Sequence, residues 1–537
     1  MEWIASYIPD PWTLLVVVAI IGSVLTLAYW SRDHRQLRHV RYRFVGGIPW
    51  GTLITLLALL AFYLVIQDGR TDWEHPVYYP YIATSYFYPF GQLTAGFAHA
   101  SAGHLLSNLL GLAIFGTIAE YAWGHYSHDA AERPKKPWVR IACIPVISGI
   151  IALTTAIFSW GPVLGFSGAV FAFAGFAVVR YPVLTIIGMV FQSALVLLTR
   201  AILSPVTIHE VTESVDVPGW AGIGFQGHGM GFLLGIVLAI LLWYRRDDPL
   251  SPGAVRVWGG ILLVGSSMGL WAIWTTAGDD VYVLYRGLGV ILLVGVAWMV
   301  AGALQADSTP TWGGISWRHV AICAICIPII AMSTAAIPMG LQVVGPMDPV
   351  EERITIEDYE IYYVTNHTHS WQPGMDLPVI GDTASEATRS GVFIRSSDRQ
   401  LQLRLASSSQ LAREGEARGI VGGVGWRSEV LVERSAWNPV GNDSVYRVTI
   451  ANENQSSVVF TAPSQQVDSQ IDHHQIALRA TETGFGIDVR DPDGTEHQVD
   501  VPAKNESVTV SDLTIARDGS TLVASTDGTR VVIATRR

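Results

Sequence analysis

The chain has 537 residues, half of them hydrophobic, and its mean hydropathy is +0.35. An ordinary soluble domain of this size does not reach such values, so the composition excludes a wholly soluble protein and indicates a membrane protein. The net charge of −11 arises in the last third of the chain, because 17 basic and 17 acidic residues precede position 347, whereas 17 basic and 28 acidic residues follow. We therefore expect a membrane region followed by a separate acidic domain.

Ten apolar runs of roughly the length that a bilayer requires make up the membrane region. They cover residues 12–30, 49–66, 99–123, 138–158, 165–179, 183–203, 225–244, 254–276, 281–304 and 319–345. Basic residues gather in the loops at 32–43, 133–140 and 245–246, and the positive-inside rule makes these loops cytoplasmic. The alternation then places the N-terminus and everything after the tenth run on the extracytoplasmic side. Three cysteines, Cys143, Cys323 and Cys326, lie within the runs and indicate no disulfide framework.

Two long outer loops separate the runs. The first, 67–98, is rich in tyrosine and other aromatic residues, which favour the interface between membrane and water. The second, 204–224, is acidic and contains proline and glycine. We expect the second loop and the adjoining helix to act as a movable cover over whatever site the bundle holds.

The acidic domain, 347–537, has the pattern of an all-β fold. Apolar and polar residues alternate at 446–450 and 530–534, and the pairs Asp493-Gly494, Asp518-Gly519 and Asp527-Gly528 are typical of hairpin turns. Four Asn-x-Ser/Thr acceptors begin at Asn366, Asn442, Asn454 and Asn505, which agrees with an extracytoplasmic position. The predicted fold class is thus an all-α polytopic membrane protein of about ten helices with a C-terminal all-β extracytoplasmic domain.

Polar side chains within the apolar runs are the candidate functional residues, because such groups are costly at membrane depth. His99, His104 and Asn108 lie at the start of the third run, where the 104/108 spacing gives His104 and Asn108 one helix face and leaves His99 pointing elsewhere. Ser167 lies between Gly165 and Gly168, and His228 precedes Gly231 and Gly235 at helical spacing. Each group by itself is more typical of helix packing or interhelical hydrogen bonding than of a functional site.

Together these groups predict nucleophilic catalysis. The stripe of Gly168, Ala172 and Gly175 matches the stripe of Gly231 and Gly235, so the two helices can approach closely and bring His228 to Ser167. A serine hydroxyl needs such a base to become a nucleophile. His104, Asn108 and the Ser167 backbone N–H are candidate donors to an oxyanion, and Gly165 keeps its space open.

In these motifs the sequence resembles the rhomboid family of intramembrane serine proteases, over residues 49–246. The resemblance is carried by the segment from His99 to His104, by Asn108, by Gly165-Phe166-Ser167-Gly168, and by His228 with Gly231 and Gly235. It implies a Ser–His dyad without a third acid, in which Ser167 is the nucleophile and His228 the base. It also implies a supporting role for His99 and a structural role for Glu120. Phe171 stands where the family usually has a tyrosine that packs on the catalytic histidine.

The expected domains are an extra N-terminal helix with its basic loop (1–46), a rhomboid-like six-helix catalytic core (47–246), three additional helices (247–346) and the β domain (347–537). The expected function is an intramembrane serine endopeptidase that cleaves transmembrane segments of client membrane proteins near the outer face. Alternatives are a non-catalytic rhomboid-like protein that binds clients, or a membrane receptor or transporter with an outer β ligand domain. Expected partners are client transmembrane segments and the bilayer, with protein or ligand docking on the β domain; we expect no nucleic acid, cofactor or metal ion.

Overall fold

The computed structural model describes residues 43–124, 136–203, 224–246, 253–276, 281–305, 316–345, 352–368, 371–373, 388–468, 471–526 and 528–536, with the single positions 15, 18, 19 and 21. The expected first span, 12–30, and the loop 204–224 fall almost entirely outside these residues. The chain divides into two compact units, residues 1–342 with 373–376, and residues 343–372 with 377–537.

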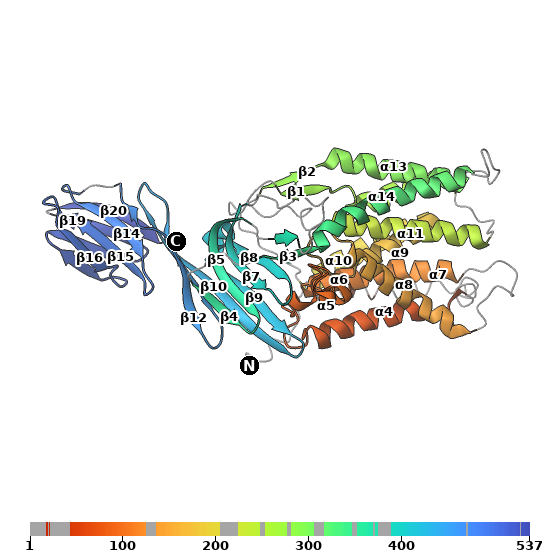
Figure 1. The fold of residues 1–537 in the computed structure, drawn as a ribbon, viewed down its shortest axis with the longest axis horizontal. Helices are drawn as coiled ribbons and strands as arrows, with labels where there is room; N and C mark the ends of the chain where they lie inside the picture. The colour runs from red at the N-terminus through yellow and green to blue at the C-terminus, as the bar shows by residue number, and fades with distance from the viewer. Residues whose placement is uncertain are drawn as a thin grey trace. The chain divides into compact units, whose positions relative to one another are not determined.

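The first unit is a bundle of apolar helices (Figure 1). Its elements are α4 (Trp50–Ala61) continued by η1 (Phe62–Ile66), η2 (Tyr79–Tyr81), α5 (Pro89–Thr94), the continuous helix of α6 (Ala102–Gly111), η3 (Leu112–Gly116) and α7 (Thr117–Trp123), then α8 (Pro137–Ile157), α9 (Ser167–Arg180), α10 (Pro182–Leu203), α11 (Phe225–Arg246), α12 (Ala254–Ser267), α13 (Arg286–Gln305) and α14 (Trp317–Gly340). Among the described residues, six helices are long and apolar enough to cross a membrane, and three are shorter, at Trp50–Ile66, Ser167–Arg180 and Ala254–Ser267. The unit is therefore a multi-pass membrane region.

Three expected spans are wrong at one end, where the structure has a strand instead of a helix. The run 254–276 is helical only to Ser267, and it continues into strand β1 (Trp274–Thr276), which pairs with β2 (Tyr282–Leu284) at the start of the run 281–304. The run 319–345 leaves its helix at Gly340 and enters β3 (Gln342–Val344). Hydropathy cannot separate these states, because apolar residues suit a strand as well as a helix.

The aromatic-rich loop 67–98 is folded and contains buried residues. Tyr79 and Tyr81 are buried, and tyrosine hydroxyls donate to backbone carbonyls, as Tyr81 Oη does to Ile66 O (2.8 Å) and Tyr86 Oη to Ile157 O (2.9 Å). These bonds satisfy carbonyls that would otherwise lack partners. The loop also pairs with the segment before α9 through an antiparallel bridge between Ala83 and Val163, and so it holds the approach to Ser167.

The second unit is β-rich, in agreement with the expected C-terminal domain. A four-stranded antiparallel sheet contains β4 (Arg353–Ile356), β5 (Tyr359–Thr368), β7 (Thr388–Ser396) and β8 (Leu401–Ser407), and a second contains β13 (Gln465–Gln466), β14 (Gln475–Ala480), β15 (Phe485–Arg490) and β16 (Glu496–Asp500). The eight-stranded sheet has the order β12-β11-β10-β20-β19-β18-β17, with β9 on β10. Its strands are β9 (Glu416–Gly423), β10 (Trp426–Pro439), β11 (Val445–Ala451), β12 (Ser456–Thr461), β17 (Ser507–Val510), β18 (Leu513–Asp518), β19 (Thr521–Thr526) and β20 (Thr529–Arg536).

Two short elements complete this unit, namely α15 (Ser408–Glu414) and β6 (Trp371–Pro373), which pairs with β3. The glycines of the three expected turns, Gly494, Gly519 and Gly528, have φ of +90°, +62° and +92°. The reason for glycine after aspartate in these hairpins is therefore the left-handed backbone.

Candidate active site

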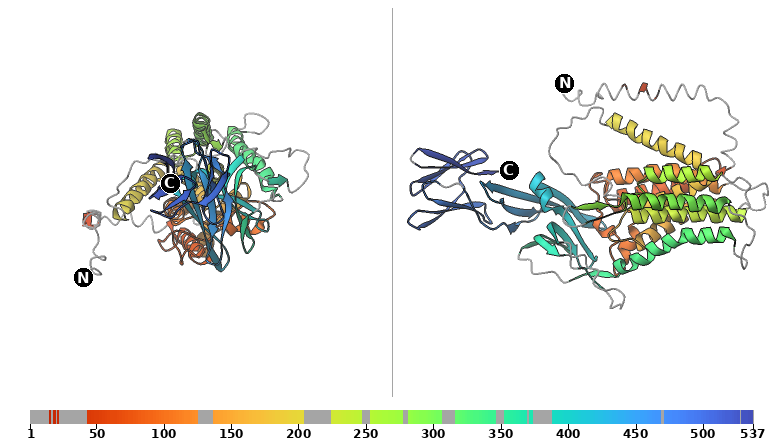
Figure 2. Two further views of the ribbon diagram at one scale, coloured as in Figure 1. Left: turned by 90° about the vertical axis from the view of Figure 1, so that its left-hand side faces the viewer. Right: turned by 90° about the horizontal axis from the view of Figure 1, so that it is seen from above.

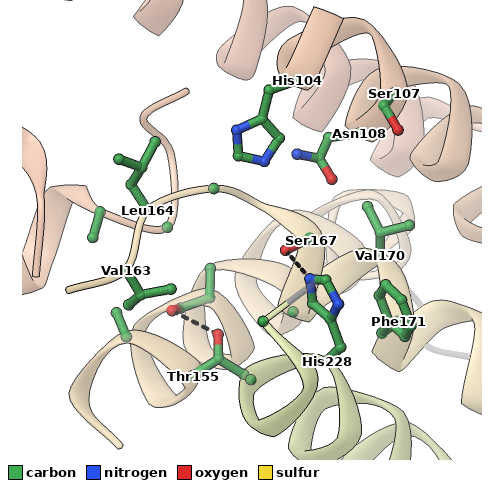
Figure 3. Close-up of a pocket in the computed structure, with 18 of the residues that line it drawn as sticks. His104, Ser107, Asn108, Thr155, Val163, Leu164, Ser167, Val170, Phe171 and His228 are labelled. Carbon is green, nitrogen blue, oxygen red and sulfur yellow. Dashed lines mark hydrogen bonds between the residues drawn. The ribbon is translucent and has the colours of Figure 1, made fainter. Parts of the chain in front are cut away.

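A cavity of about 560 Å³ lies at the start of α9 within the helical unit. Figure 3 shows the Ser167 hydroxyl in this cavity, between His228 on one side and His104 with Asn108 on the other. The lining comes from α6, η3, α8, α9, α10 and α11, from Met268 just after α12, and from β1, so residues far apart in the sequence line one cavity. Among them are His104, Asn108, Thr155, Gly165, Ser167, Phe171, Gln192, His228, Met268 and Trp274.

Ser167 is the first residue of α9, and its side chain contacts His228 on α11. The Ser167 Oγ atom lies 2.8 Å from His228 Nε2, within the distance that proton transfer between them requires. In the described part of the chain, His228 Nδ1 is buried without a hydrogen-bond partner. The arrangement is therefore a serine–histidine pair in which no carboxylate of the described residues bonds to the second ring nitrogen of the imidazole.

The imidazole of His228 is held by stacking. The rings of Phe171 and His228 have centroids 4.2 Å apart and planes within 10° of each other. Phe171 lies one helical turn after Ser167 on α9, so a single helix carries both the Ser167 hydroxyl and the ring against which the His228 imidazole stacks. The ring alone supplies this support, because phenylalanine lacks the hydroxyl that a tyrosine would add.

Close approach of α9 and α11 brings the pair together. A Cβ atom added at Gly231 would lie 2.1 Å from Gly168 O, and one at Gly235 would lie 1.9 Å from Ala172 O. In the opposite direction, a Cβ at Gly175 would lie 2.2 Å from Phe232 O. Backbone thus meets backbone along both helices, as the matching small-residue stripes predict.

Gly165 occupies a position that other residues would not tolerate. Its φ is +118°, and an added Cβ would lie 2.6 Å from His104 Cε1 and 2.7 Å from His104 Nε2. Its N–H donates to Ala95 O (2.8 Å) in the loop 67–98. The loop therefore fixes the turn before α9, and the missing side chain leaves space beside the His104 ring.

His104 and Asn108 face the cavity from α6. Ser101 caps this helix, accepting a hydrogen bond from the His104 backbone N–H at 3.2 Å. Asn108 is 5% exposed, and its Nδ2 atom has no hydrogen-bond partner among the described residues. A buried donor without a partner is costly, and Asn108 lines the cavity that holds Ser167, so this donor is available to a group that enters the cavity.

His99 does not point away from His104, contrary to the expectation from helical spacing. The two rings meet edge to face with centroids 5.0 Å apart. The spacing argument fails because the helix begins at Ala102, after His99. The His99 backbone is fixed by Gln67, which accepts from His99 N (2.9 Å) and donates to His99 O (2.8 Å).

Glu120 lies outside the cavity lining, in the middle of α7. Its carboxylate accepts hydrogen bonds from Gly51 N (3.1 Å), Thr52 N (2.8 Å) and Thr52 Oγ1 (2.8 Å). These backbone donors belong to the first turn of α4, where a negative charge is favourable. Glu120 therefore joins two helices at one end of the bundle.

Sequence reasoning missed several cavity residues. Thr155 of α8 packs against Gly168 and bonds to its own helix through Ile151 O (3.0 Å). Gln192 is the single amide in α10, so its polarity in an apolar run is a signal that could have been used. Met268 and Trp274 carry no such signal, because apolar residues are ordinary in an apolar run. In the part of the chain that the structure describes, no group of metal-ligating residues is arranged to hold a metal ion.

The fold and the site together define a multi-pass membrane protein with a serine–histidine pair in a cavity inside its helical bundle. Residues 88–245 match the family model described as Rhomboid domain, so this part of the chain is a rhomboid domain, and the match supports a rhomboid-family membrane protein. The match begins near the end of the loop 67–98 and ends in α11, so it leaves out α4, which lies within the residues 49–246 of the resemblance. No curated protein and no solved structure matches the chain.

Proposed function

We propose that the protein is an intramembrane serine endopeptidase that cleaves transmembrane segments of client membrane proteins. The observation that carries this proposal is the 2.8 Å contact between Ser167 Oγ and His228 Nε2 in a cavity of the bundle. Rhomboid-family proteins include inactive members, so the family alone does not decide between a protease and a client-binding protein. Retention of both reactive groups favours the protease.

The reaction begins with attack of Ser167 Oγ on the carbonyl carbon of a client peptide bond, while His228 Nε2 takes the hydroxyl proton. The tetrahedral intermediate collapses when His228 returns this proton to the leaving nitrogen, which gives an acyl ester on Ser167 and frees one client fragment. A water molecule then attacks the ester, His228 takes its proton, and the second fragment leaves as a carboxylic acid as Ser167 recovers its hydrogen.

The negative oxygen of both tetrahedral intermediates needs hydrogen-bond donors. We assign this role to the Ser167 backbone N–H and to two side chains, Asn108 Nδ2 and the His104 ring. Both side chains face the Ser167 hydroxyl across the cavity (Figure 3). One donor of this kind contributes about 3 kcal/mol in other acyl-transfer enzymes. Gly165 leaves the space that the oxygen occupies.

The client must expose a peptide carbonyl, which an intact helix hides in its own hydrogen bonds. We therefore expect clients with small or helix-breaking residues near the extracytoplasmic face. Entry beside α10 fits this scheme, because α10 leans away from the other helices toward its C-terminal end (Figure 2) and Gln192 on α10 lines the cavity. The extracytoplasmic position of both termini, and docking of a protein or ligand on the β domain, belong to the same proposal.

Labelling with a fluorophosphonate tests the nucleophile, because this reagent modifies an activated serine without requiring a client. The purified wild-type protein should be labelled, whereas Ser167→Ala should not, and His228→Ala should be labelled at least about 100-fold more slowly. The same variants should fail to cleave a reconstituted client with a helix-breaking residue near its outer end. Intact client cleavage by Ser167→Ala would rule out the proposal, and absence of labelling and cleavage in the wild type would favour a client-binding protein.

A further inference from the structure

The chain that follows the rhomboid match contributes residues to the candidate active site. Met268 and Trp274 line the same cavity as Ser167 and His228, although both lie beyond residue 245, where the family match ends. The additional helices therefore do more than enlarge the bundle.

The length of α12 explains how Met268 reaches the cavity. This helix has 14 residues, as does α9, and a Cβ at Gly260 would lie 3.0 Å from Val178 Cγ2 near the far end of α9. At 1.5 Å per residue, the distance along α9 from Val178 back to Ser167 is about 16 Å. The distance along α12 from Gly260 on to Met268 is about 12 Å. Met268 thus ends within about one helical turn of the level of Ser167.

A glycine stops α12 at this level. Gly269 has φ +76°, Gly269 N donates to Ser266 O (3.3 Å) and Leu270 N donates to Gly265 O (2.9 Å). These two bonds form a Schellman motif, which ends a helix and turns the chain back. The short helix leaves room on its outer side, and the β1–β2 hairpin with Trp274 fills that room.

The segment after the turn is held in place. Tyr285 N donates to Ile273 O (2.7 Å) at the base of the hairpin, and Trp274 pairs in register with Leu284. A Cβ at Gly289 of α13 would lie 1.9 Å from Trp271 O, so the α13 backbone packs directly on the turn. Trp274 therefore has a fixed position at the cavity.

The chemistry of the wall differs from that of the catalytic side. One side of the cavity is polar and consists of Ser167, His228, His104 and Asn108. On the wall, Met268 has a flexible thioether and Trp274 a large aromatic surface. Thioether and indole groups bind apolar side chains well, and methionine adapts to their shape. Resting on the proposed protease function, we infer that Met268 and Trp274 form a specificity wall, which binds a large apolar side chain of the client close to the scissile bond.

The test uses pairs of reconstituted clients, and the two clients of a pair differ only by leucine or alanine at one position. A separate pair is made for each position around the cleavage site, and the cleavage of its two clients is compared. The wild type should prefer leucine at one of these positions. Trp274→Ala and Met268→Ala should each lower this preference about tenfold, the scale expected when a hydrophobic contact is lost from a pocket. Trp298→Ala is the matched control, since Trp298 on α13 is 72% exposed and lies outside the cavity lining, and it should leave the preference unchanged.

Fluorophosphonate labelling of each variant separates this inference from the proposed function. If the wild type is neither labelled nor active, the protease proposal fails. If the wall variants are labelled like the wild type and keep its preference, or prefer leucine more strongly, the wall does not bind the client and the inference is overturned. A photo-crosslinking amino acid at position 274 of the Ser167→Ala protein gives a second readout without catalysis. Crosslinking to the client residue next to the cleavage site supports the wall, and its absence there, with efficient crosslinking elsewhere on the client, contradicts it.

Discussion

The ring of Phe171 lies flat against the imidazole of His228, with centroids 4.2 Å apart and an interplanar angle of 10°. Stacking fixes the plane of the imidazole, and the contact with Ser167 Oγ fixes its direction. With no hydrogen bond from Nδ1 to a described residue, the orientation of the base depends on this ring more than it would in a triad with a carboxylate.

Replacing Phe171 with leucine should therefore lower kcat/KM for client cleavage about 3- to 10-fold, because an aromatic pair contributes about 0.5–1.5 kcal/mol beyond the area it buries. Phe171→Tyr keeps the ring and should stay within about twofold of the wild type. The rate of fluorophosphonate labelling should follow the same order. Equal rates for the leucine and tyrosine variants would show that the stacking does not orient the base.

Gly165→Ala should abolish activity. The substitution places a methyl group 2.6 Å from His104 Cε1, and a displacement of about 1 Å in a catalytic group can cost about 100-fold. Gly161→Ala is a matched control, because Gly161 has nearly the same φ, +116°, but open space around its Cβ. Both variants carry backbone strain of about 1–3 kcal/mol, yet only Gly165→Ala should lose labelling. Similar losses in both would assign the effect to backbone strain instead of the His104 contact.

Gly231→Ala should separate α9 from α11. Its methyl group would lie 2.1 Å from Gly168 O, whereas the same change at Gly229 meets nothing within 4 Å. Overpacking of this kind costs about 1–3 kcal/mol, and it also moves His228 away from Ser167. We expect a lower thermal midpoint in detergent and slower labelling for Gly231→Ala, with Gly229→Ala close to the wild type in both. A normal midpoint in Gly231→Ala would mean that the helices are not in backbone contact.

The serine–histidine pairing could be predicted from the sequence because polar residues in apolar runs are conspicuous and the glycine spacing indicated which helices approach. The His99–His104 contact could not be predicted from helical periodicity, since it depends on the helix beginning at Ala102. Ser101, which caps this helix, was the available signal.

The wall made by Met268 and Trp274 was beyond prediction for a different reason. An apolar run of 23 residues, 254–276, fits a membrane helix by length, and only Gly269 marks the point where the helix stops. A glycine within an apolar run is common in membrane helices, so this signal is weak without the contacts that the turn makes with α13.

Glu120→Gln should destabilise the bundle without changing the chemistry of the site. The carboxylate accepts three hydrogen bonds at the start of α4. A glutamine amide has only one acceptor oxygen, and its NH₂ group would face the donors of Gly51 and Thr52 without an acceptor. We expect a loss of about 1–3 kcal/mol in stability, measured as a lower thermal midpoint, with normal labelling of the protein that remains folded. Thr52→Val removes one of the three hydrogen bonds and should lower the thermal midpoint less than Glu120→Gln does. A larger decrease in Thr52→Val would contradict the proposal that the Glu120 carboxylate joins α4 to α7.

The β domain contains an ion pair whose contribution to stability depends on pH. Burial by itself would raise the pKa of Asp358, but hydrogen bonds from Arg399 and Ser396 outweigh it and hold the pKa below the ordinary value. Arg399 donates through Nε (2.7 Å) and Nη2 (2.8 Å) to separate oxygens of the carboxylate, and Ser396 Oγ donates at 2.6 Å. Asp358 lies in the turn between β4 and β5, Ser396 ends β7, and Arg399 lies in the turn between β7 and β8. The Asp358 carboxylate therefore joins these two turns.

Because the folded-state pKa of Asp358 is depressed, its stabilisation is fully present above the unfolded value, about pH 4, and is lost as the pH falls through the folded-state pKa. Asp358→Asn should lower the β-domain unfolding temperature at pH 7 and bring it closer to the wild-type value at low pH. Calorimetry of the full-length protein from pH 7 to pH 3 measures this, with Asp398→Asn as the control for charge on the same connection. A constant difference between wild type and Asp358→Asn across this range would show that the pair contributes nothing that depends on ionisation.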